Sequence, residues 1–190
     1  TITELADPVF ETRTVSNPDA IGDLTATVTD SESGSANNTI GTAQSVAITD
    51  FDITNGNDVG DASLPRAVIK GSINTNNDID FYSIPVLAGD RLVFDIDFGQ
   101  VGGLDPVDTQ LHIFNGFNEL VGSNDDSDIS NGGTGSTQRY DPYLTYTAIG
   151  DENITVSVSS YNNDGSTGGS FTNTGYSSGD YALNISINRD

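Results

Sequence analysis

The feature that most constrains the fold of this chain is an alternation of apolar and polar residues with a period of two. In the segment 91–98 every second residue is leucine, phenylalanine or isoleucine, and the segments 153–159 and 181–187 repeat the pattern. Successive side chains of a β-strand point to opposite faces, so this alternation predicts strands with one face in a core. No segment carries a helical stripe of apolar residues of useful length. The sequence therefore predicts an all-β protein.

The candidate strands are short and are separated by clusters of Gly, Asn, Asp and Ser. They are expected at 45–53, 67–73, 81–86, 91–98, 110–114, 144–148, 154–159 and 181–187, with a weaker candidate at 24–29. Many short strands with turn signals between them are typical of an antiparallel sandwich or barrel. We favour a jelly-roll-like β-sandwich with long Asp/Asn/Gly-rich loops. The two longest loops, 123–136 and 162–179, are expected to be either functional or disordered.

The length of 190 residues fits one domain. Residues 36–190 hold the clear strand signals and form the predicted sandwich. Residues 1–35 are acidic and rich in Ser and Thr, and we interpret them as an N-terminal linker or an edge-strand extension.

Charge narrows the range of functions. The chain has 28 acidic and 6 basic residues, a formal net charge of −22, and these carboxylates repel one another unless salt or bound cations offset them. Nucleic acid and anionic membrane surfaces are themselves polyanions and are therefore poor partners. No apolar run approaches the roughly 20 residues that span a bilayer. With no cysteine for disulfides, calcium is the natural staple of a secreted domain of this composition.

Four loop segments concentrate oxygen ligands: 76–80, 104–108, 123–128 and 140–142. Calcium takes six to eight oxygens from carboxylates, amides, backbone carbonyls and water. The alternative is that Asp and Asn fill turns, where their side chains cap local backbone. The crowding of Asp125, Asp126 and Asp128 favours a metal, because adjacent carboxylates without a counter-charge are costly. No EF-hand spacing is present, so a calcium site would be assembled from several loops.

An ordered series of short motifs extends over about residues 36 to 188. In chain order the motifs are Asp78-Ile79-Asp80-Phe81-Tyr82-Ser83, Ala88-Gly89-Asp90-Arg91-Leu92, Leu104-Asp105-Pro106, Leu111-His112-Ile113-Phe114, Asn118-Glu119-Leu120, Ser123-Asn124-Asp125-Asp126, Asp141-Pro142-Tyr143-Leu144, Val156-Ser157-Val158-Ser159-Ser160-Tyr161 and Gly179-Asp180-Tyr181-Ala182-Leu183. The series resembles the bacterial pre-peptidase C-terminal (PPC) domain, which is related to the collagen-binding domains of secreted collagenases. The resemblance is specific because the motifs occur in the family's order.

The resemblance implies a calcium-binding jelly-roll sandwich without an active site, attached to secreted proteases or found in large calcium-dependent (RTX-type) adhesins. The family's paired acidic residues before an aromatic dipeptide correspond to Asp78 and Asp80, which are expected to be calcium ligands. An acidic-x-Asn-Asp-Thr stretch of the family corresponds to residues 35–39, which makes Asn38 a further candidate ligand. Two carboxylates of that pattern are missing here, which puts the N-terminal half of the site in doubt.

A second cluster of expected calcium ligands is formed by acidic loop residues: Asp105, Asp108, Asp125, Asp126, Asp128 and Asp141. A calcium ion there with an open position would accept a peptide carboxylate or a pair of sugar hydroxyls. Candidate ligand-binding side chains near this cluster are Arg139, Tyr140, Tyr143, Tyr161 and Tyr176. The alternatives are a surface salt bridge for Arg139 and packing at the core edge for Tyr143 and Tyr161.

Nothing in the sequence selects an enzyme. The single histidine, His112, lies in a predicted strand and is expected to be a packed or exposed residue of the sandwich rather than a catalytic base. No nucleophile elbow, zinc-binding helix or phosphate-binding glycine loop is present.

The predicted function is a calcium-dependent adhesion module of a large secreted or surface bacterial protein, monomeric within its parent chain. It would bind an extracellular peptide, protein or glycan on a host or neighbouring cell. The alternative is a non-catalytic structural or targeting accessory domain of a secreted protease or other hydrolase.

Overall fold

The structure is a computed structural model, which describes residues 28–30, 37–53, 61, 63–97, 107–132, 135–136 and 138–189. The described strands are β1 (Val28–Thr29), β2 (Gln44–Ser45), β3 (Arg66–Ile73), β4 (Ile79–Val86), β5 (Arg91–Asp97), β6 (Thr109–Phe114), β7 (Leu120–Asn124), β8 (Tyr143–Thr147), β9 (Glu152–Ser160), β10 (Gly165–Ser166), β11 (Ser170–Phe171) and β12 (Gly179–Asn188). Two short 3₁₀ turns, η2 (Ile40–Thr42) and η3 (Ile48–Asp50), flank β2.

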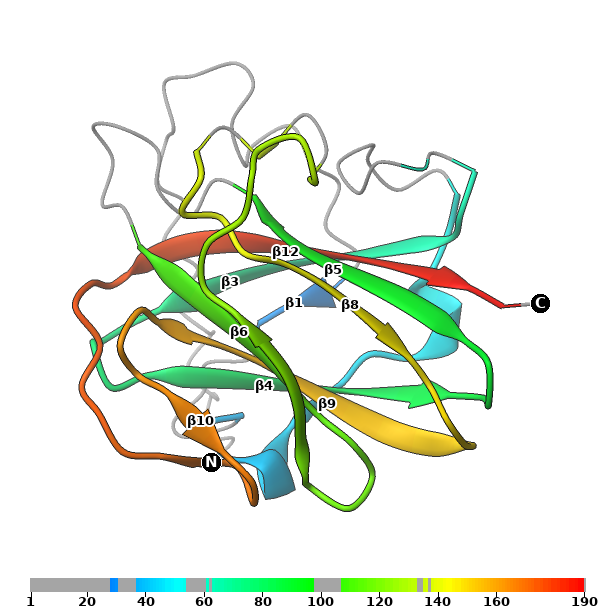
Figure 1. The fold of residues 1–190 in the computed structure, drawn as a ribbon, viewed down its shortest axis with the longest axis horizontal. Coiled ribbons are helices and arrows are strands. Elements are labelled where there is room, and N and C mark those ends of the chain that lie inside the picture. The colour runs from blue at the N-terminus through cyan, green and yellow to red at the C-terminus, as the bar shows by residue number, and fades with distance from the viewer. Residues whose placement is uncertain are drawn as a thin grey trace, which may run out of the picture.

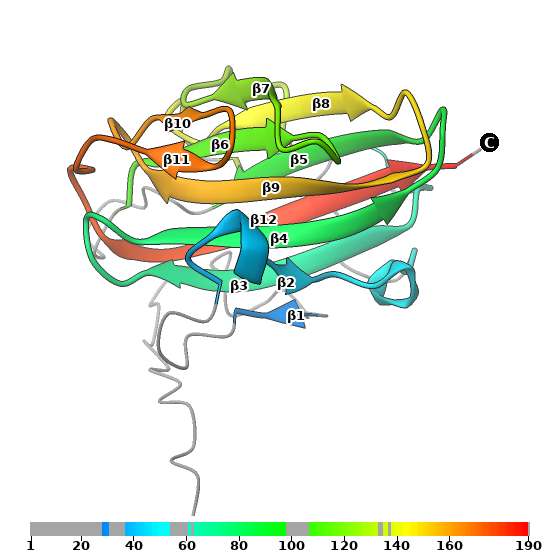
Figure 2. The same cartoon turned by 90° about the horizontal axis from the view of Figure 1, so that it is seen from below.

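Two five-stranded sheets pack face to face (Figures 1 and 2). Their strand orders are β1-β3-β12-β5-β8 and β2-β4-β9-β6-β7. Without β1 and β2, the eight long strands have the order of a jelly roll, in which one sheet takes the first, eighth, third and sixth strands and the other the second, seventh, fourth and fifth. All pairs among these eight are antiparallel, which confirms the predicted fold class.

The two shortest edge strands differ from this pattern. β1 pairs in parallel with β3, and β2 pairs in parallel with β4. Both lie on the same side of the sandwich, opposite β7 and β8 (Figure 2). Residues 28–30 therefore run along the sandwich as an edge strand. Residues 1–27 and 31–35 lie outside the described part of the chain.

The core lies where the alternating strands face each other. Leu92, Phe94 and Ile96 of β5 are fully buried there, as are Val156 and Val158 of β9. Every second residue points inward, so the alternation in the sequence places the core correctly.

The predicted strand at 45–53 is wrong beyond Ser45. A carboxylate oxygen of Asp50 accepts the Ala47 backbone N–H at 2.8 Å, and the Asp50 N–H donates to the Ala47 carbonyl at 2.9 Å. These local bonds close the 3₁₀ turn η3 in place of a strand. The strand predicted at 24–29 is described only at Val28–Thr29, and the other residues of that segment lie outside the described part of the chain.

The predicted loop 162–179 contains a small hairpin, β10–β11, that covers the outer face of the second sheet. The Phe171 ring packs edge-on against Phe81 and His112, with centroids 5.7 and 5.1 Å away. His112 is thereby only 2% exposed, which agrees with its interpretation as a packed residue. Among the described residues, no helix has the length and apolarity that crossing a membrane requires.

Candidate calcium and ligand sites

Four oxygen-bearing side chains lie near one another beside the edge strand β1. Together with Asn38, which follows Asn37 in the chain, we call them the N-terminal cluster: Asp30, Asn37, Asn38, Asp78 and Asp80. Asp30 follows β1, and its backbone N–H donates to the Lys70 carbonyl of β3 at 2.9 Å. Asn37 lies beside β4, because its carbonyl accepts the Phe81 N–H at 3.0 Å. The two edges are tied together where the Asn37 Nδ2 donates to Oδ1 of Asp30 at 2.7 Å.

The two predicted aspartates of this cluster differ in their surroundings. Asp78 lies in the turn between β3 and β4, and its carboxylate accepts the N–H groups of Asn74 at 2.7 Å and Ile79 at 3.1 Å. Burial raises the pKa of Asp78, these two bonds oppose the rise, and Asp30 adds to it. Asp80 points into the sandwich, is fully buried and accepts the Tyr181 hydroxyl at 2.7 Å. Asp78 thus also has the turn-capping role that was the alternative to metal binding.

Two amide oxygens of the cluster have no donor. Asn37 is 1% exposed, and its Oδ1 has no hydrogen-bond partner among the described residues. The Oδ1 of Asn38 is buried and equally lacks a donor within the described part of the chain. A buried carbonyl oxygen without a partner costs about 1–3 kcal/mol. A cation would remove that cost, and amide oxygens are ligands that calcium accepts.

Among the described residues, no three Asp, Glu, His or Cys side chains are arranged to hold a metal by themselves. A cation at the N-terminal cluster therefore needs the amide oxygens of Asn37 and Asn38 as well as carboxylates. Asp30 is a further carboxylate beside Asn37, and sequence reasoning did not find it. Its position depends on the parallel pairing of β1 with β3, for which the acidic lead-in gives no pattern signal.

Three of the predicted loop aspartates lie near one another, and we call Asp108, Asp125 and Asp126 the loop cluster. Burial, together with the charges of Asp126 and Asp125, raises the pKa of Asp108 to about 6. The Oδ1 of Asp108 has no hydrogen-bond partner among the described residues. Burial and Asp125 also raise the pKa of Asp126, whereas Arg139 lowers it.

Two further predicted metal ligands, Asp128 and Asp141, lie in other settings. Asp128 is exposed and closes its own turn by accepting the N–H and hydroxyl of Ser130 at 2.9 and 2.6 Å. Asp141 is buried beside the end of β5, because the Ile96 N–H donates to the carbonyl of the next residue, Pro142, at 3.1 Å. Asp105 lies outside the described residues.

Sequence reasoning did not predict that two aspartates of β5 are buried. Asp95 and Asp97 lie on the polar face of an alternating strand, yet both are 0% exposed. The Ser136 hydroxyl lies 3.3 Å from each carboxylate, and the Asn184 amide donates to Asp97 at 2.7 Å. The loop that follows β7 covers this face, which periodicity alone cannot reveal.

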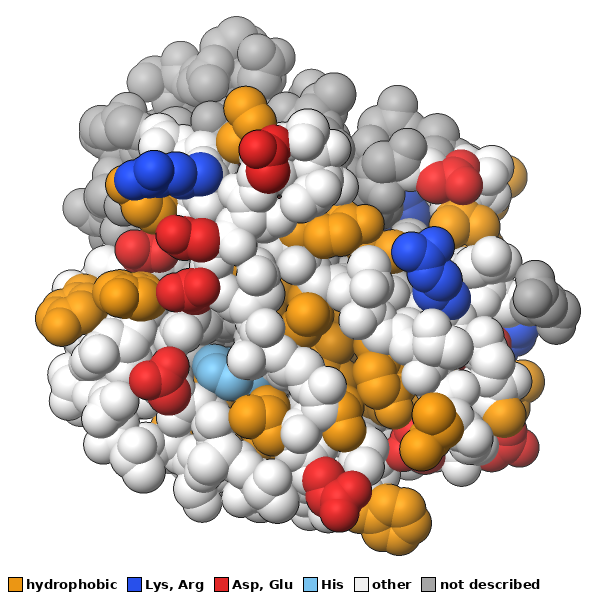
Figure 3. Space-filling model, in the orientation of Figure 1, with side chains coloured by type: hydrophobic (Ala, Val, Ile, Leu, Met, Phe, Trp, Pro, Cys, Tyr) orange, Lys and Arg blue, Asp and Glu red, His pale blue; other side chains and the backbone are white. Residues whose placement is uncertain are grey.

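An aromatic pair borders the loop cluster. The rings of Tyr161 and Tyr176 lie 5.6 Å apart and are 40% and 68% exposed. The Tyr161 N–H donates to the Asp108 carbonyl at 2.7 Å, which holds the pair next to the carboxylates. Figure 3 shows acidic side chains gathered between a basic group and a hydrophobic projection on this part of the surface.

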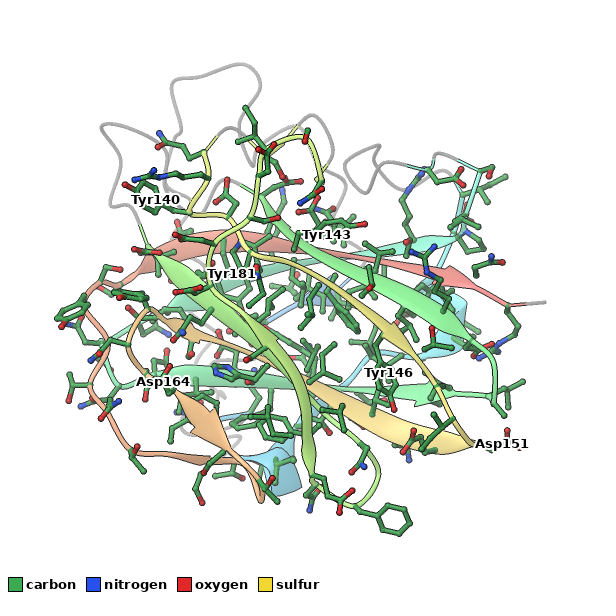
Figure 4. The ribbon with its side chains drawn as sticks, in the orientation of Figure 1. Tyr140, Tyr143, Tyr146, Asp151, Asp164 and Tyr181 are labelled. Carbon is green, nitrogen blue, oxygen red and sulfur yellow. The ribbon has the colours of Figure 1, made fainter. Side chains whose placement is uncertain are left out.

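The other predicted ligand-binding residues occupy two different settings. The guanidinium of Arg139 lies over the Tyr140 ring, 5.0 Å from its centroid, and donates to its hydroxyl at 3.1 Å. Tyr140 lies in the loop above the sandwich (Figure 4), and Arg139 precedes it in the chain. Tyr143 begins β8 and is half-buried, and burial and the charge of Asp95 raise its pKa. Tyr143 lies opposite Asp95 in the β5–β8 ladder, and its neighbours Leu144 and Tyr146 are the β8 residues that pack against the core. A ligand contact of Tyr143 stays a prediction.

The chain matches no protein-family model and none of the curated proteins. It is similar to solved structures of low sequence identity. One is the pre-peptidase C-terminal domain of a collagenase from Bacillus anthracis, at 12% identity and a TM-score of 0.42, covering 75% of this chain and 93% of that chain. Another is Aeromonas hydrophila PliG, a periplasmic inhibitor of g-type lysozyme, at 16% identity and a TM-score of 0.41, covering 77% and 97%.

The Salmonella Typhimurium PliG gives a TM-score of 0.40 at 16% identity and covers 77% of this chain and 99% of that chain. Scores of this size carry no argument about function. Membership of the PPC family therefore stays a prediction from the sequence motifs, and the function is argued below from the residues of this chain.

Proposed function

We propose that this chain is a non-catalytic binding module of an extracellular protein, in which calcium at the N-terminal cluster fastens the edge strand β1 to the sandwich. The proposal rests on the buried Oδ1 of Asn37, which has no hydrogen-bond donor among the described residues. The Nδ2 of the same amide group donates to Asp30. Calcium would be held by the amide oxygens of Asn37 and Asn38 and by at most two of the cluster's three carboxylates, because no three acidic side chains of the described residues are arranged to hold a metal. Its charge would favour the ionised form of Asp78, whose pKa is raised by burial and, to a smaller extent, by the charge of Asp30.

An accessory role agrees with these features better than catalysis does. The ordered motifs of the sequence resemble a family of accessory domains of secreted proteins. The single histidine is buried under the β10–β11 hairpin, where no substrate reaches it. This chain has no cysteine and cannot form disulfides, so a bound cation would provide the cross-link that disulfides provide in other secreted domains.

The test is thermal unfolding and calorimetric titration with calcium, each repeated in excess EDTA. A ligand present at 100 times its dissociation constant stabilises the folded state by about 2.7 kcal/mol, which shifts the melting temperature visibly. Asp80→Asn keeps an oxygen acceptor for Tyr181 and removes one carboxylate charge, so it should lose most of the calcium-dependent shift.

Asp151→Asn is the matched control, because Asp151 is exposed in the β8–β9 turn and only accepts the Ala88 N–H at 2.9 Å. This variant should keep the full calcium response. Equal calcium-dependent shifts in wild type and Asp80→Asn would refute the proposed site.

A second candidate function is calcium-dependent adhesion through the loop cluster. The observation that favours it is the unpartnered Oδ1 of Asp108, which lies beside the exposed tyrosine pair. A calcium ion there would bridge to a peptide carboxylate or to sugar hydroxyls, and the two rings would provide a flat contact surface.

Peptide and glycan arrays probed with and without EDTA test this second function. Binding should be lost in EDTA, and both Asp126→Asn and Tyr176→Ala should weaken it. Binding that is unchanged by EDTA would exclude a bridging ion.

A further inference from the structure

We propose that the free edge of β8 takes an extended basic peptide as an added strand of the first sheet. β8 is the last strand of its sheet, and no described strand pairs with its outer side. Its sequence, Tyr-Leu-Thr-Tyr-Thr, consists of residues with good strand propensity except for one leucine and contains no charge and no proline. Edge strands are usually blunted by charge, proline or a bulge, and β8 has none of these.

The ladder between β5 and β8 shows which backbone groups of β8 point outward. At one end the Ile96 N–H donates to the Pro142 carbonyl at 3.1 Å, and at the other the Ala148 N–H donates to the Asp90 carbonyl at 2.9 Å. In an antiparallel pair, the residues that exchange hydrogen bonds alternate along the strand. The even-numbered residues of β8 therefore face β5, and the backbone groups of Tyr143, Thr145 and Thr147 face outward.

One of these outward groups is already used. The Tyr143 N–H donates to Oδ1 of Asn124 at 3.1 Å, which agrees with the alternation and ties the start of β8 to β7. The N–H and carbonyl groups of Thr145 and Thr147 have no hydrogen-bond partner within the described part of the chain. They form a short template for one incoming strand.

The side chains along this edge leave apolar surface that a further strand would cover. Leu144 and Tyr146 pack against the core but are only partly buried, and Val121 of the neighbouring strand β7 is 43% exposed. The Leu144 side chain lies beside Gly122 of β7, where an added Cβ would be 3.6 Å from Cδ2 of Leu144. Hydrophobic side chains are visible along this side of the molecule in Figure 3, and Tyr146 lies on β8 in Figure 4.

Two kinds of extended partner could pair with this edge, a second copy of the chain or a separate peptide, and charge favours one of them. Two copies of this chain would each bring a net charge of −22 to an edge-to-edge pair. Asp125 and Asp126 follow β7 directly, at the end where β7 is bonded to Tyr143. Like charges oppose pairing with a second copy, whereas a peptide with lysine or arginine near its end would be attracted to the carboxylates. The occupant is therefore a basic extended peptide.

The probe is the synthetic peptide Lys-Thr-Val-Thr-Val-Thr-Lys, with a glutamate-flanked version and a version with a central proline as controls. The lysine-flanked peptide should bind, and the other two should bind much more weakly. Amide hydrogen exchange should slow at Thr145 and Thr147 on binding, whereas Tyr143, already bonded to Asn124, should change little. This pattern would not arise from general attraction to an acidic surface.

The matched variants are Thr145→Pro and Thr145→Val. Proline is tolerated on an edge strand where the N–H faces solvent, so Thr145→Pro should fold, and it removes the outward donor. It should weaken peptide binding about tenfold or more, while Thr145→Val should bind as wild type does. Circular dichroism and the melting temperature check that both variants are folded.

Three results would overturn the proposal: no binding of the lysine-flanked peptide to wild type, equal binding to the folded Thr145→Pro variant, or no slowing of exchange at Thr145 and Thr147. Self-association at high salt that Thr145→Pro abolishes, without peptide binding, would show that the edge takes a second copy instead.

Discussion

The hydroxyl of Tyr181 donates a 2.7 Å hydrogen bond to Oδ2 of Asp80, and both residues are fully buried. Tyr181 lies between the two sheets (Figure 4) and also shares a 2.7 Å hydrogen bond with the Tyr82 hydroxyl. Burial, together with the charge of Asp80, raises the pKa of both tyrosines well above the usual value. Both hydroxyls therefore keep their protons, and Tyr181 links the core to the N-terminal cluster.

Tyr181→Phe tests this link. The change leaves a buried Asp80 oxygen without its donor, which should lower the free energy of unfolding by about 1–3 kcal/mol. Urea unfolding followed by circular dichroism measures the loss. Tyr146→Phe is the control, because the Tyr146 hydroxyl donates to Glu152 at 3.0 Å from a half-buried position. The interpretation fails if the control loses as much stability as Tyr181→Phe.

Gly71→Ala should also destabilise the fold, because Gly71 faces Tyr181 across the β3–β12 ladder. A Cβ at this position would lie 2.4 Å from the Cζ and hydroxyl oxygen of Tyr181. The hydrogen bonds of that hydroxyl hold the ring in place, so overpacking should cost about 1–3 kcal/mol. The fall in melting temperature relative to wild type measures this loss of stability. Gly150→Ala, which would meet no atom within 4 Å, should change the melting temperature little, and similar losses in both variants would contradict this account.

Periodicity predicted the sandwich because the inward residues of β5, β9 and β12 alternate cleanly. It failed where local or distant hydrogen bonds decide the structure. Asp50 turns the chain into η3, and β7 lacks an alternating apolar face. Of the six loop aspartates that the motifs grouped, the structure places Asp108, Asp125 and Asp126 near one another, and their role as calcium ligands stays a prediction. Asp30 could not be found, because its place depends on pairing with a strand about 40 residues away.

Asp108→Asn should stabilise the protein at neutral pH in EDTA. Burial beside Asp126 and Asp125 raises the pKa of Asp108 to about 6 in the folded state, above the value near 4 of an unfolded chain. The folded state therefore binds this proton more tightly, and the penalty for the charge appears as the pH rises through 6. The variant should melt at a higher temperature than wild type at pH 7.5 and at the same temperature below about pH 4.

Calcium should reverse this difference if the loop cluster holds an ion. Wild type would then gain stability at pH 7.5 that Asp108→Asn does not, and the gain would shrink as the pH falls below 6. Melting curves at several calcium concentrations and pH values measure both effects. Asp164→Asn, an exposed carboxylate near the β10–β11 hairpin, is the control and should respond as wild type does.

His112 gives a pH dependence of the opposite sign. Its Nε2 accepts the Gly165 N–H of the β10–β11 hairpin at 3.0 Å, and Phe171 covers the ring, so the imidazole must stay neutral to keep this contact. Burial lowers the pKa of His112 to about 4, and the nearby Asp164 opposes the change. The ordinary value in an unfolded chain is near 6.5.

The unfolded chain therefore binds this proton first, and the stability associated with neutral His112 is fully present above pH 6.5 and is lost as the pH falls toward 4. The difference of about 2.5 pH units corresponds to roughly 3 kcal/mol. His112→Gln has no group that titrates in this range and should lack this part of the pH dependence. Urea unfolding of both proteins from pH 4 to pH 8 isolates the effect of His112, because the carboxylates titrate alike in both. A constant difference in unfolding free energy across that range would show that His112 is not the titrating group.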